Sequence, residues 1–404
     1  MAEEEAEVVS GRLEQRQRFV HEHRELLGRS FGCDVEAVDS LPDAGHADEA
    51  YSRAGEAADR AAAAGDRAGE LCARIRQGIN RLYVAPEGAT EQLAVLVDEA
   101  LPLFEAAADD FGLLLSHFAQ SQVAHMRSKM DIALEALEHA VIDAERLCMP
   151  HLAATLPLQG GRGAARLFGS TPIPALLAWL DEQENEHEYT LLYRASALAM
   201  IGRFADAREI LSDLRARFAD QGSTIMLGLT EGHVSAEVEL LADDPAAAAE
   251  FAERGCRLLE QTGDKAWLST SLGILAQAQY QLGRLDEAAS SAARAAELGA
   301  SDDAITQMLW RQVTAKVLAR RGESDEAERL ADEAIAIGND TDMLDGVGDA
   351  HLDMAEVLTL AGRTDEAGEA LQQALTLYER KGTLVKVERT RTRLRELSSA
   401  AEPP

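Results

Sequence analysis

The feature that most constrains this chain is a short figure that recurs about every 40 residues. It reads GRFADA at Gly202, GRLDEA at Gly283, GESDEA at Gly322 and GRTDEA at Gly362, and DDPAAA places Asp243 in the same slot. Successive landmarks therefore lie 41, 40, 39 and 40 residues apart. A regular period of this length indicates an array of repeated structural units.

Alanine occupies two fixed positions around every landmark, one seven residues before it and one five residues after it. The ten residues are Ala195, Ala207, Ala236, Ala248, Ala276, Ala288, Ala315, Ala327, Ala355 and Ala367. Small residues at fixed positions let two helices approach closely. Glycine at the landmark can end the first helix in a left-handed conformation, and the acidic residues after it suit the first turn of a second helix. Each repeat is therefore predicted to be a helical hairpin.

Composition supports an all-α fold, because aromatic residues make up only 4% of the chain and strands are enriched in them. Fainter copies of the figure at Gly45, Gly88, Ser128 and Ser170 continue the period upstream. We expect a right-handed superhelical solenoid of about nine hairpins.

The expected organisation follows from the clarity of the repeat along the chain. Its parts are an acidic tail with a capping helix near Leu13 to Leu27 (1–41), divergent hairpins (42–149), an irregular glycine-rich joint (150–174), the C-terminal array (175–397) and a disordered tail (398–404).

The spacing Ala-x6-Gly-x4-Ala resembles that of the tetratricopeptide repeat, a helix–turn–helix unit whose usual period is about 34 residues. GSTPIPALLAWL from Gly169, RASALAMIGRFADAREIL from Arg194 and MLWRQVTAKVLARRGE from Met308 resemble the tetratricopeptide-type region of actinobacterial STAND-type signalling ATPases. Such proteins often carry adenylate or guanylate cyclase domains or LuxR-type DNA-binding domains. The resemblance runs from Gly169 to Leu397 and implies a regulatory array that controls an effector.

The charge and the cysteines of the chain limit the classes of partner and the cell compartment that we expect. Lys and Arg total 39 against 71 Asp and Glu, a net charge of −32, which disfavours nucleic-acid binding. The basic stretch from Lys386 to Glu396 has interleaved acids and is expected to be a solvated helix face. Four scattered cysteines without a C-x-x-C motif fit a reducing cytoplasm. No stretch has the roughly 20 apolar residues that span a bilayer, so we expect a cytoplasmic protein with no membrane partner.

Motifs that carry chemistry are missing from the sequence. It contains neither the G-x-x-x-x-G-K-[ST] loop that cradles phosphates nor the H-E-x-x-H zinc motif. The sequence therefore predicts a protein that is not an enzyme, with no catalytic residues, metal site or cofactor.

Repeat geometry predicts where a binding site would lie, because the first helix of each hairpin lines the concave face of such an array. Polar residues stand six positions before each landmark, and two more lie one helical turn earlier. The candidate groove residues are Ser196, His233, Glu237, Gln277, Gln312, Lys316 and Glu356. We predict that they bind a protein or peptide partner. Two alternatives stay open: a hydrated face without a ligand, and a small-molecule-sensing array that controls a separate ATPase, cyclase or transcription effector.

Overall fold

A computed structural model describes residues 47–147, 156–183 and 187–401. Every regular element within these ranges is a helix, which confirms the all-α prediction for them. The expected tail and capping helix (1–41) and residues 402–404 lie outside the described residues. The N-terminal helices are α2 (Ala47–Ala64), α3 (Arg67–Val84), α4 (Ala89–Ala107), α5 (Asp110–Met126), α6 (Met130–Arg146), α8 (Leu156–Phe168) and α9 (Ile173–Asp181).

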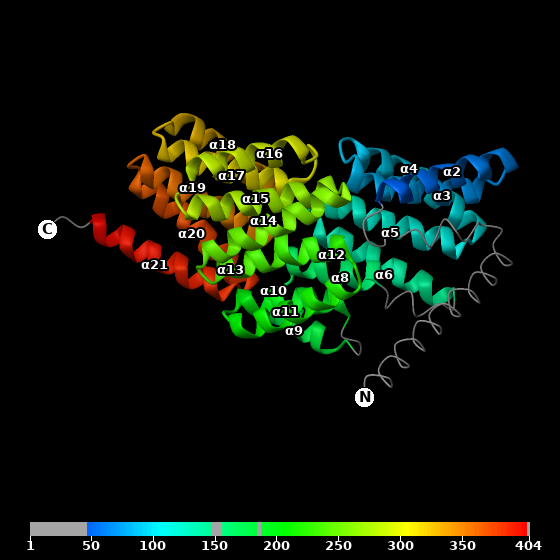
Figure 1. Ribbon diagram of the computed structural model, residues 1–404, viewed down its shortest axis with the longest axis horizontal. Coiled ribbons are helices and arrows are strands. Elements are labelled where there is room, and N and C mark those ends of the chain that lie inside the picture. Colours follow the sequence, from blue (N-terminus) through cyan, green and yellow to red (C-terminus); the bar gives the residue numbers. More distant parts are fainter. Residues whose placement is uncertain (1–46, 148–155, 184–186, 402–404) are drawn as a thin grey trace.

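The clearer repeats form the second part of the array. Its helices are α10 (Glu188–Met200), α11 (Phe204–Asp220), α12 (Thr224–Leu229), the π-helix η2 (Thr230–Ser235), α13 (Ala236–Leu241), α14 (Pro245–Thr262), α15 (Lys265–Gln281), α16 (Leu285–Leu298), α17 (Ala304–Arg320), α18 (Ser324–Asn339), α19 (Leu344–Leu360), α20 (Thr364–Lys381) and α21 (Leu384–Ala401). Figure 1 shows these helices stacked as successive antiparallel pairs.

The predicted hairpins are present, with one helix before each landmark and one after it. The described residues hold eight complete pairs: α3 with α4, α5 with α6, α8 with α9, α10 with α11, α12 to α13 with α14, α15 with α16, α17 with α18, and α19 with α20. First helices of neighbouring hairpins contact each other, as α15 does α17 and α17 does α19, whereas α16, α18 and α20 touch one another less. The first helices therefore lie at the smaller radius and form what we call the inner wall.

The turn inside each of the five hairpins from α10 to α20 contains a left-handed residue. The φ angles are 86° at Gly202, 74° at Gly283, 83° at Gly322 and 77° at Gly362, while Asp243 adopts 64°. At Gly322 no heavy atom lies within 4 Å of where a Cβ would be. Backbone conformation, rather than lack of space, is thus what favours glycine at that turn.

The ten repeat alanines are buried between the paired helices. Nine have no exposed surface, and Ala355 is 2% exposed. Around them Leu, Val and Met side chains complete the cores of neighbouring hairpins, as in the cluster that joins Ala315, Ala327, Ala355 and Ala367 with Leu358. A larger side chain at any of these positions would push two helix axes apart.

One repeat contains an extra residue, which explains the spacing of 41 between Gly202 and Asp243. The residue is absorbed in η2, because a π-helical turn holds one residue more than an α-helical turn. Here the backbone packs against backbone: a Cβ at Gly255 of α14 would lie 2.2 Å from the nitrogen of Gly232 in η2.

Two expected boundaries differ from the structure. The segment 150–174, expected to be irregular, contains the helix α8. Its glycines allow close packing rather than a break: a Cβ at Gly161 would lie 2.9 Å from Leu137 Cδ1, and one at Gly163 would lie 2.3 Å from Tyr193 Cδ2. At the C-terminus, α21 continues to Ala401, so the expected disordered tail begins too early.

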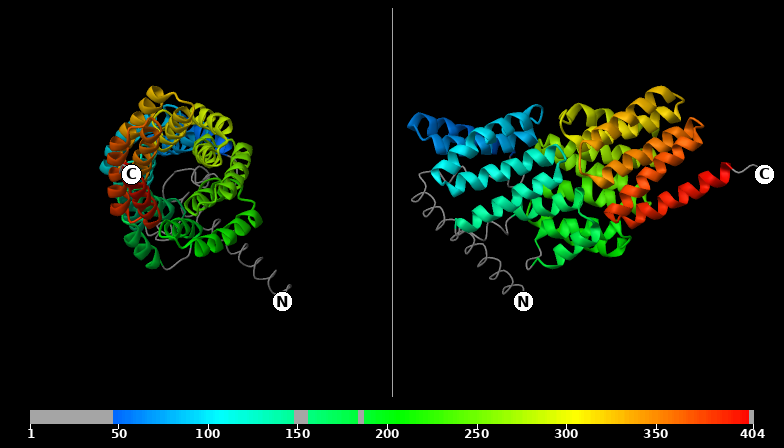
Figure 2. Two further views of the ribbon diagram at one scale, coloured as in Figure 1. Left: turned by 90° about the vertical axis from the view of Figure 1, so that its left-hand side faces the viewer. Right: turned by 180° about the vertical axis from the view of Figure 1, so that it is seen from behind.

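The array makes more than one superhelical turn, so its later hairpins contact its first hairpins. Viewed end-on, the helices circle a common axis (Figure 2), and hydrogen bonds join residues 210 to 215 positions apart in the sequence. One superhelical turn therefore takes between five and six repeats of about 40 residues. The loops inside the N-terminal hairpins, near Glu87, Lys129 and Thr171, rest on the later connections near Ser301, Asp342 and Lys381.

We predict opposite effects of one substitution at two glycines. Gly322→Ala should lower the free energy of unfolding by about 1–2 kcal/mol, because alanine disfavours the left-handed conformation. Gly368→Ala, inside α20, should raise it by about 1 kcal/mol, because glycine is a poor helix former and the new Cβ would meet only Leu397 at 3.7 Å. Urea unfolding of both variants checks this, and equal effects would contradict the assigned role of Gly322.

Candidate functional site

A bonded polar network crosses the inner wall, and its centre is Lys316 on α17. Its Nζ donates to Gln277 Oε1 on α15 at 2.6 Å and pairs with Asp353 Oδ1 on α19 at 2.8 Å. The ammonium also lies 5.0 Å from the centre of the Tyr280 ring. Only 1% of the Lys316 side chain is exposed, so these contacts replace its hydration and tie three successive first helices together.

A second layer of the network lies one helical turn further along the same helices. Tyr280 donates its hydroxyl proton to Glu356 Oε1 at 2.6 Å. Arg320 donates from Nε to the Tyr280 hydroxyl and from Nη2 to Glu356 Oε1, both at 3.0 Å. Burial acts to raise the pKa of Glu356, but Lys316, the Tyr280 hydrogen bond and nearby cations outweigh it and lower the pKa. Glu356 is therefore held as a carboxylate.

A third layer joins α19 to α21. Lys386 pairs with Asp345 and with Asp349, the latter at 2.7 Å, and Tyr378 donates its hydroxyl proton to Asp349 at 2.6 Å. Burial lowers the pKa of Lys386, but the two carboxylates outweigh it and raise the pKa above its ordinary value. The expectation that the stretch from Lys386 is solvated is wrong at this residue, because the sequence alone did not show that two acids of α19 face it.

Glu237 on α13 faces this third layer. Burial raises the pKa of Glu237 to about 7; Lys386 opposes the shift, and Asp349 and Asp345 add to it. Asp353 behaves similarly, since burial raises its pKa to about 6 against the effect of Lys316. The inner wall thus carries carboxyl groups that are only partly compensated by neighbouring cations.

Three of the predicted groove residues lie outside this network. Ser196 donates to the carbonyl of Leu192 at 3.3 Å. His233 lies 3.2 Å from the carbonyl oxygen of Trp267 and meets its ring edge-on, and burial lowers the pKa of His233 to about 4, so the imidazole is neutral. Gln312 is 4% exposed, and its Nε2 has no hydrogen-bond partner.

The network joins predicted residues to others that sequence reasoning missed. Gln277, Lys316 and Glu356 belong to it, and Glu237 faces it. The missed members are Tyr280, Arg320, Asp345, Asp349, Asp353, Tyr378 and Lys386. Helical spacing could have revealed some of them, because Tyr280, Arg320 and Asp353 each lie three or four residues from a predicted residue on the same face.

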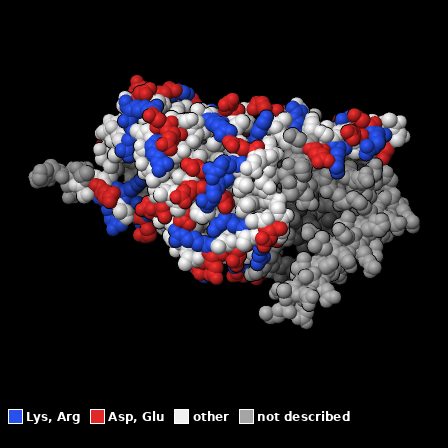
Figure 3. Space-filling model, in the orientation of Figure 1, with Lys and Arg blue, Asp and Glu red and all other residues white. Residues whose placement is uncertain are grey.

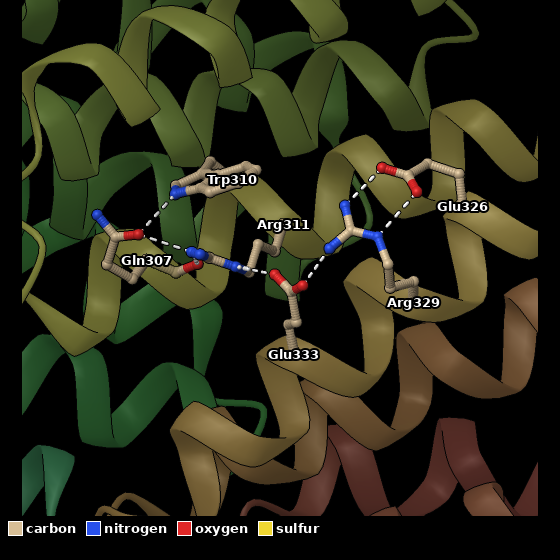
Figure 4. Close-up of polar contacts among 6 residues, drawn as sticks. All are labelled: Gln307, Trp310, Arg311, Glu326, Arg329 and Glu333. Carbon is tan, nitrogen blue, oxygen red and sulfur yellow. Dashed lines mark hydrogen bonds and ion pairs between the residues drawn. The ribbon is translucent and has the colours of Figure 1, made fainter.

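The hairpin of α17 and α18 also carries a chain of polar contacts that is more open to solvent. Figure 4 shows Gln307, Arg311, Glu333, Arg329 and Glu326 joined in sequence, with Trp310 bound to Gln307. The side chains of Arg329 and Glu326 are 52% and 50% exposed, so solvent weakens their pairing. Charges of both signs are interspersed over the face of the described residues that Figure 3 shows. The exposed pair of Arg329 and Glu326 is therefore a suitable control for the buried pairs of the inner wall.

Neither a metal cluster nor a membrane-spanning helix is found within the ranges that the structure describes. No group of three or more His, Cys, Asp or Glu side chains among the described residues is placed to hold a metal ion. None of the described helices is both long and apolar enough to cross a membrane.

The comparisons with known proteins agree with this architecture. The tetratricopeptide-repeat family model matches residues 270–294, 313–333 and 348–373, which fall on the hairpins α15–α16, α17–α18 and α19–α20. No curated protein is significantly similar to this chain in sequence.

Among solved structures, the APC/C hetero-tetramer Cut9–Hcn1 aligns with a TM-score of 0.57 and 13% identity, covering 82% of this chain and 57% of that one. This chain therefore spans little more than half the length of that match. A Rap protein complexed with competence and sporulation factor aligns with a TM-score of 0.44 and 12% identity, covering 88% and 94% of the two chains. The repeat match and the Cut9–Hcn1 alignment show a tetratricopeptide-like helical solenoid.

We predict a pH-dependent effect of Glu237→Gln. A carboxyl whose pKa is raised on folding destabilises the folded state increasingly as pH rises from about 4.5 to about 7. The variant lacks this charge, so its gain in unfolding free energy over the unmodified protein should grow across that window, by up to about 3 kcal/mol, and then level off. Urea unfolding at pH 5, 6, 7 and 8 measures it; a gain independent of pH would show that Glu237 titrates normally.

Proposed function

We propose that the protein is a non-catalytic scaffold that binds a protein or peptide partner on its inner wall. The observation that carries this is the layered polar network, which places ordered polar and charged groups across the first helices α15, α17 and α19 and on α21. Arrays of stacked helical repeats present extended concave surfaces suited to such partners. The match to tetratricopeptide repeats supports the same class of function.

The charges of the wall favour a partner with basic side chains. The network and Glu237 together hold five carboxyl groups, Glu237, Asp345, Asp349, Asp353 and Glu356, against Lys316, Arg320 and Lys386, with Arg393 close to Glu356. A cationic group beside Glu237 would restore its ionised form. The net charge of −32 would also steer a basic partner toward the chain.

A displayed library of random peptides tests the proposal without a known partner. Peptides selected on the unmodified protein should be enriched in Lys and Arg, and should bind the Arg320→Ala/Glu356→Ala variant at least about tenfold more weakly, a loss of about 1.4 kcal/mol. The matched control, Arg329→Ala/Glu326→Ala, removes an exposed ion pair and should change the affinity less than about twofold.

Photo-crosslinking locates the bound peptide directly. A photoreactive residue in place of the exposed Arg393, which lies close to Glu356, should label the selected peptides, while one in place of Glu326 should not. Equal labelling at both positions, or full affinity in the Arg320→Ala/Glu356→Ala variant, would place binding elsewhere and refute the proposal. The regulatory role beside a STAND-type ATPase, cyclase or transcription effector stays a prediction from the sequence resemblance.

A further inference from the structure

We propose that the contacts between the two superhelical turns form a latch, an interface that opens and closes without unfolding any hairpin and that is coupled to the inner wall. We call this interface the seam. It consists of the turn-one residues Glu87, 129–131 and 166–171 and the turn-two residues Ser301, 340–342 and Lys381.

The first seam contact is a helix cap supplied from a distance. The helix α6 has Lys129 at its N-cap, which forms no side-chain cap. Instead, the carboxylate of Asp342 accepts from the backbone nitrogens of Met130 at 2.8 Å and Asp131 at 2.7 Å. Those amides are unpaired within the helix, and the positive helix end favours a carboxylate. Lys129 in turn donates to the carbonyl of Asp340.

In the second contact a cation meets the end of a helix, whereas in the first a carboxylate meets the start of one. Lys381 has no exposed surface, and its ammonium donates to the carbonyl oxygens of Arg166, Gly169 and Thr171 at 3.0, 2.7 and 2.8 Å. These carbonyls lie at and beyond the end of α8, where a helix presents partial negative charge. The Lys381 ammonium of the second superhelical turn thus satisfies the last carbonyl groups of α8 in the first superhelical turn.

Between these polar contacts the seam buries one apolar cluster. On the first turn it contains Ala124, Met130, Ala133 and Ala165, and on the second turn Met308, Ala334, Met343 and Ala350. More than half of these residues are alanine, and larger partly buried side chains such as Phe168 and Ile337 pack around them.

The hairpins on either side have cores of their own. One cluster lies within α3 to α6 and another within α17 to α20, apart from a few neighbouring side chains. Because repeat arrays are stabilised mainly by contacts between sequence neighbours, separating the turns exposes the seam but leaves these cores closed. The seam can therefore open as a local unit at a lower free energy than unfolding of the hairpins.

A further contact, between α21 and α13, lies outside the residues that define the seam and reaches the inner wall; the coupling step rests on the proposed function. Arg389 of α21 donates from Nη2 to the carbonyl of Leu241, at the end of α13, at 2.6 Å. One helical turn earlier in α13 lies Glu237, whose pKa Lys386 of α21 lowers against the larger effect of burial. A basic peptide held by Glu237 and the acids of α19 would contact both sides of the closure, so its binding would favour the closed state.

Hydrogen exchange of the unmodified protein tests the latch without any substitution. The amides of Met130 and Asp131, capped across the seam, should exchange at least about tenfold faster than that of Gly112, which Asp109 caps within its own hairpin at 3.0 Å. Exchange of all three only through global unfolding would overturn the proposal.

The Asp342→Ala/Lys381→Met variant tests the same idea by removing both polar contacts. Small-angle scattering should show a larger radius of gyration with unchanged helical circular dichroism. An unchanged radius, or loss of helix together with the seam, would show that no separable latch exists.

A covalent link across the seam gives the opposite test. A short bismaleimide reagent should cross-link Glu87→Cys/Ser301→Cys, because the Glu87 carboxylate reaches the Ser301 hydroxyl at 2.8 Å, whereas it should not cross-link Glu87→Cys/Asp340→Cys. Mass mapping distinguishes these bonds from the natural cysteines. If coupling holds, the selected peptides should bind the open variant about fivefold more weakly and the cross-linked protein at least as tightly as the unmodified one. Equal affinities of the open, cross-linked and unmodified proteins would show that the seam is not coupled to the inner wall. If only the Arg320→Ala/Glu356→Ala variant lost binding, the proposed function would still hold.

Discussion

The close approach of paired helices at the alanine positions is the constraint on which the whole molecule depends. With no side chain beyond Cβ at ten fixed places, each hairpin can bring its two helices together and leave larger residues to fill the flanks. The hairpins then stack one after another, and the summed rotation along the array brings residues some 212 positions apart into contact. Local packing of a small residue is in this way the origin of the long-range geometry.

Much of the fold could be predicted because the determinants are local. The turn at Gly322, the buried Ala315 and the acidic start of α18 all depend on residues within one hairpin. The glycines of α8 misled the prediction because glycine serves two purposes, chain reversal and close packing. Only the positions of Leu137 and Tyr193, far away in sequence, distinguish them.

The candidate site was less predictable for a related reason. Repeat offsets identified Gln277, Lys316 and Glu356, since each occupies the same position in its own hairpin. They could not show that Lys386 meets two acids of α19, or that Asp342 caps α6, because such contacts depend on the summed rotation of many repeats. No short motif records that sum. The inner wall and the seam are therefore properties of the assembled array rather than of any single unit.

The π-helical turn η2 has a consequence for how such an array can change over time. An additional residue in a rigid helix would rotate the preceding part of that helix by about 100° relative to the part after the insertion. Here the widened turn confines the disturbance to six residues, and α13 resumes with Ala236 buried in its usual place. The array can thus accept a one-residue insertion inside a helix, not only in its loops, and still keep Glu237 aligned with the neighbouring repeats.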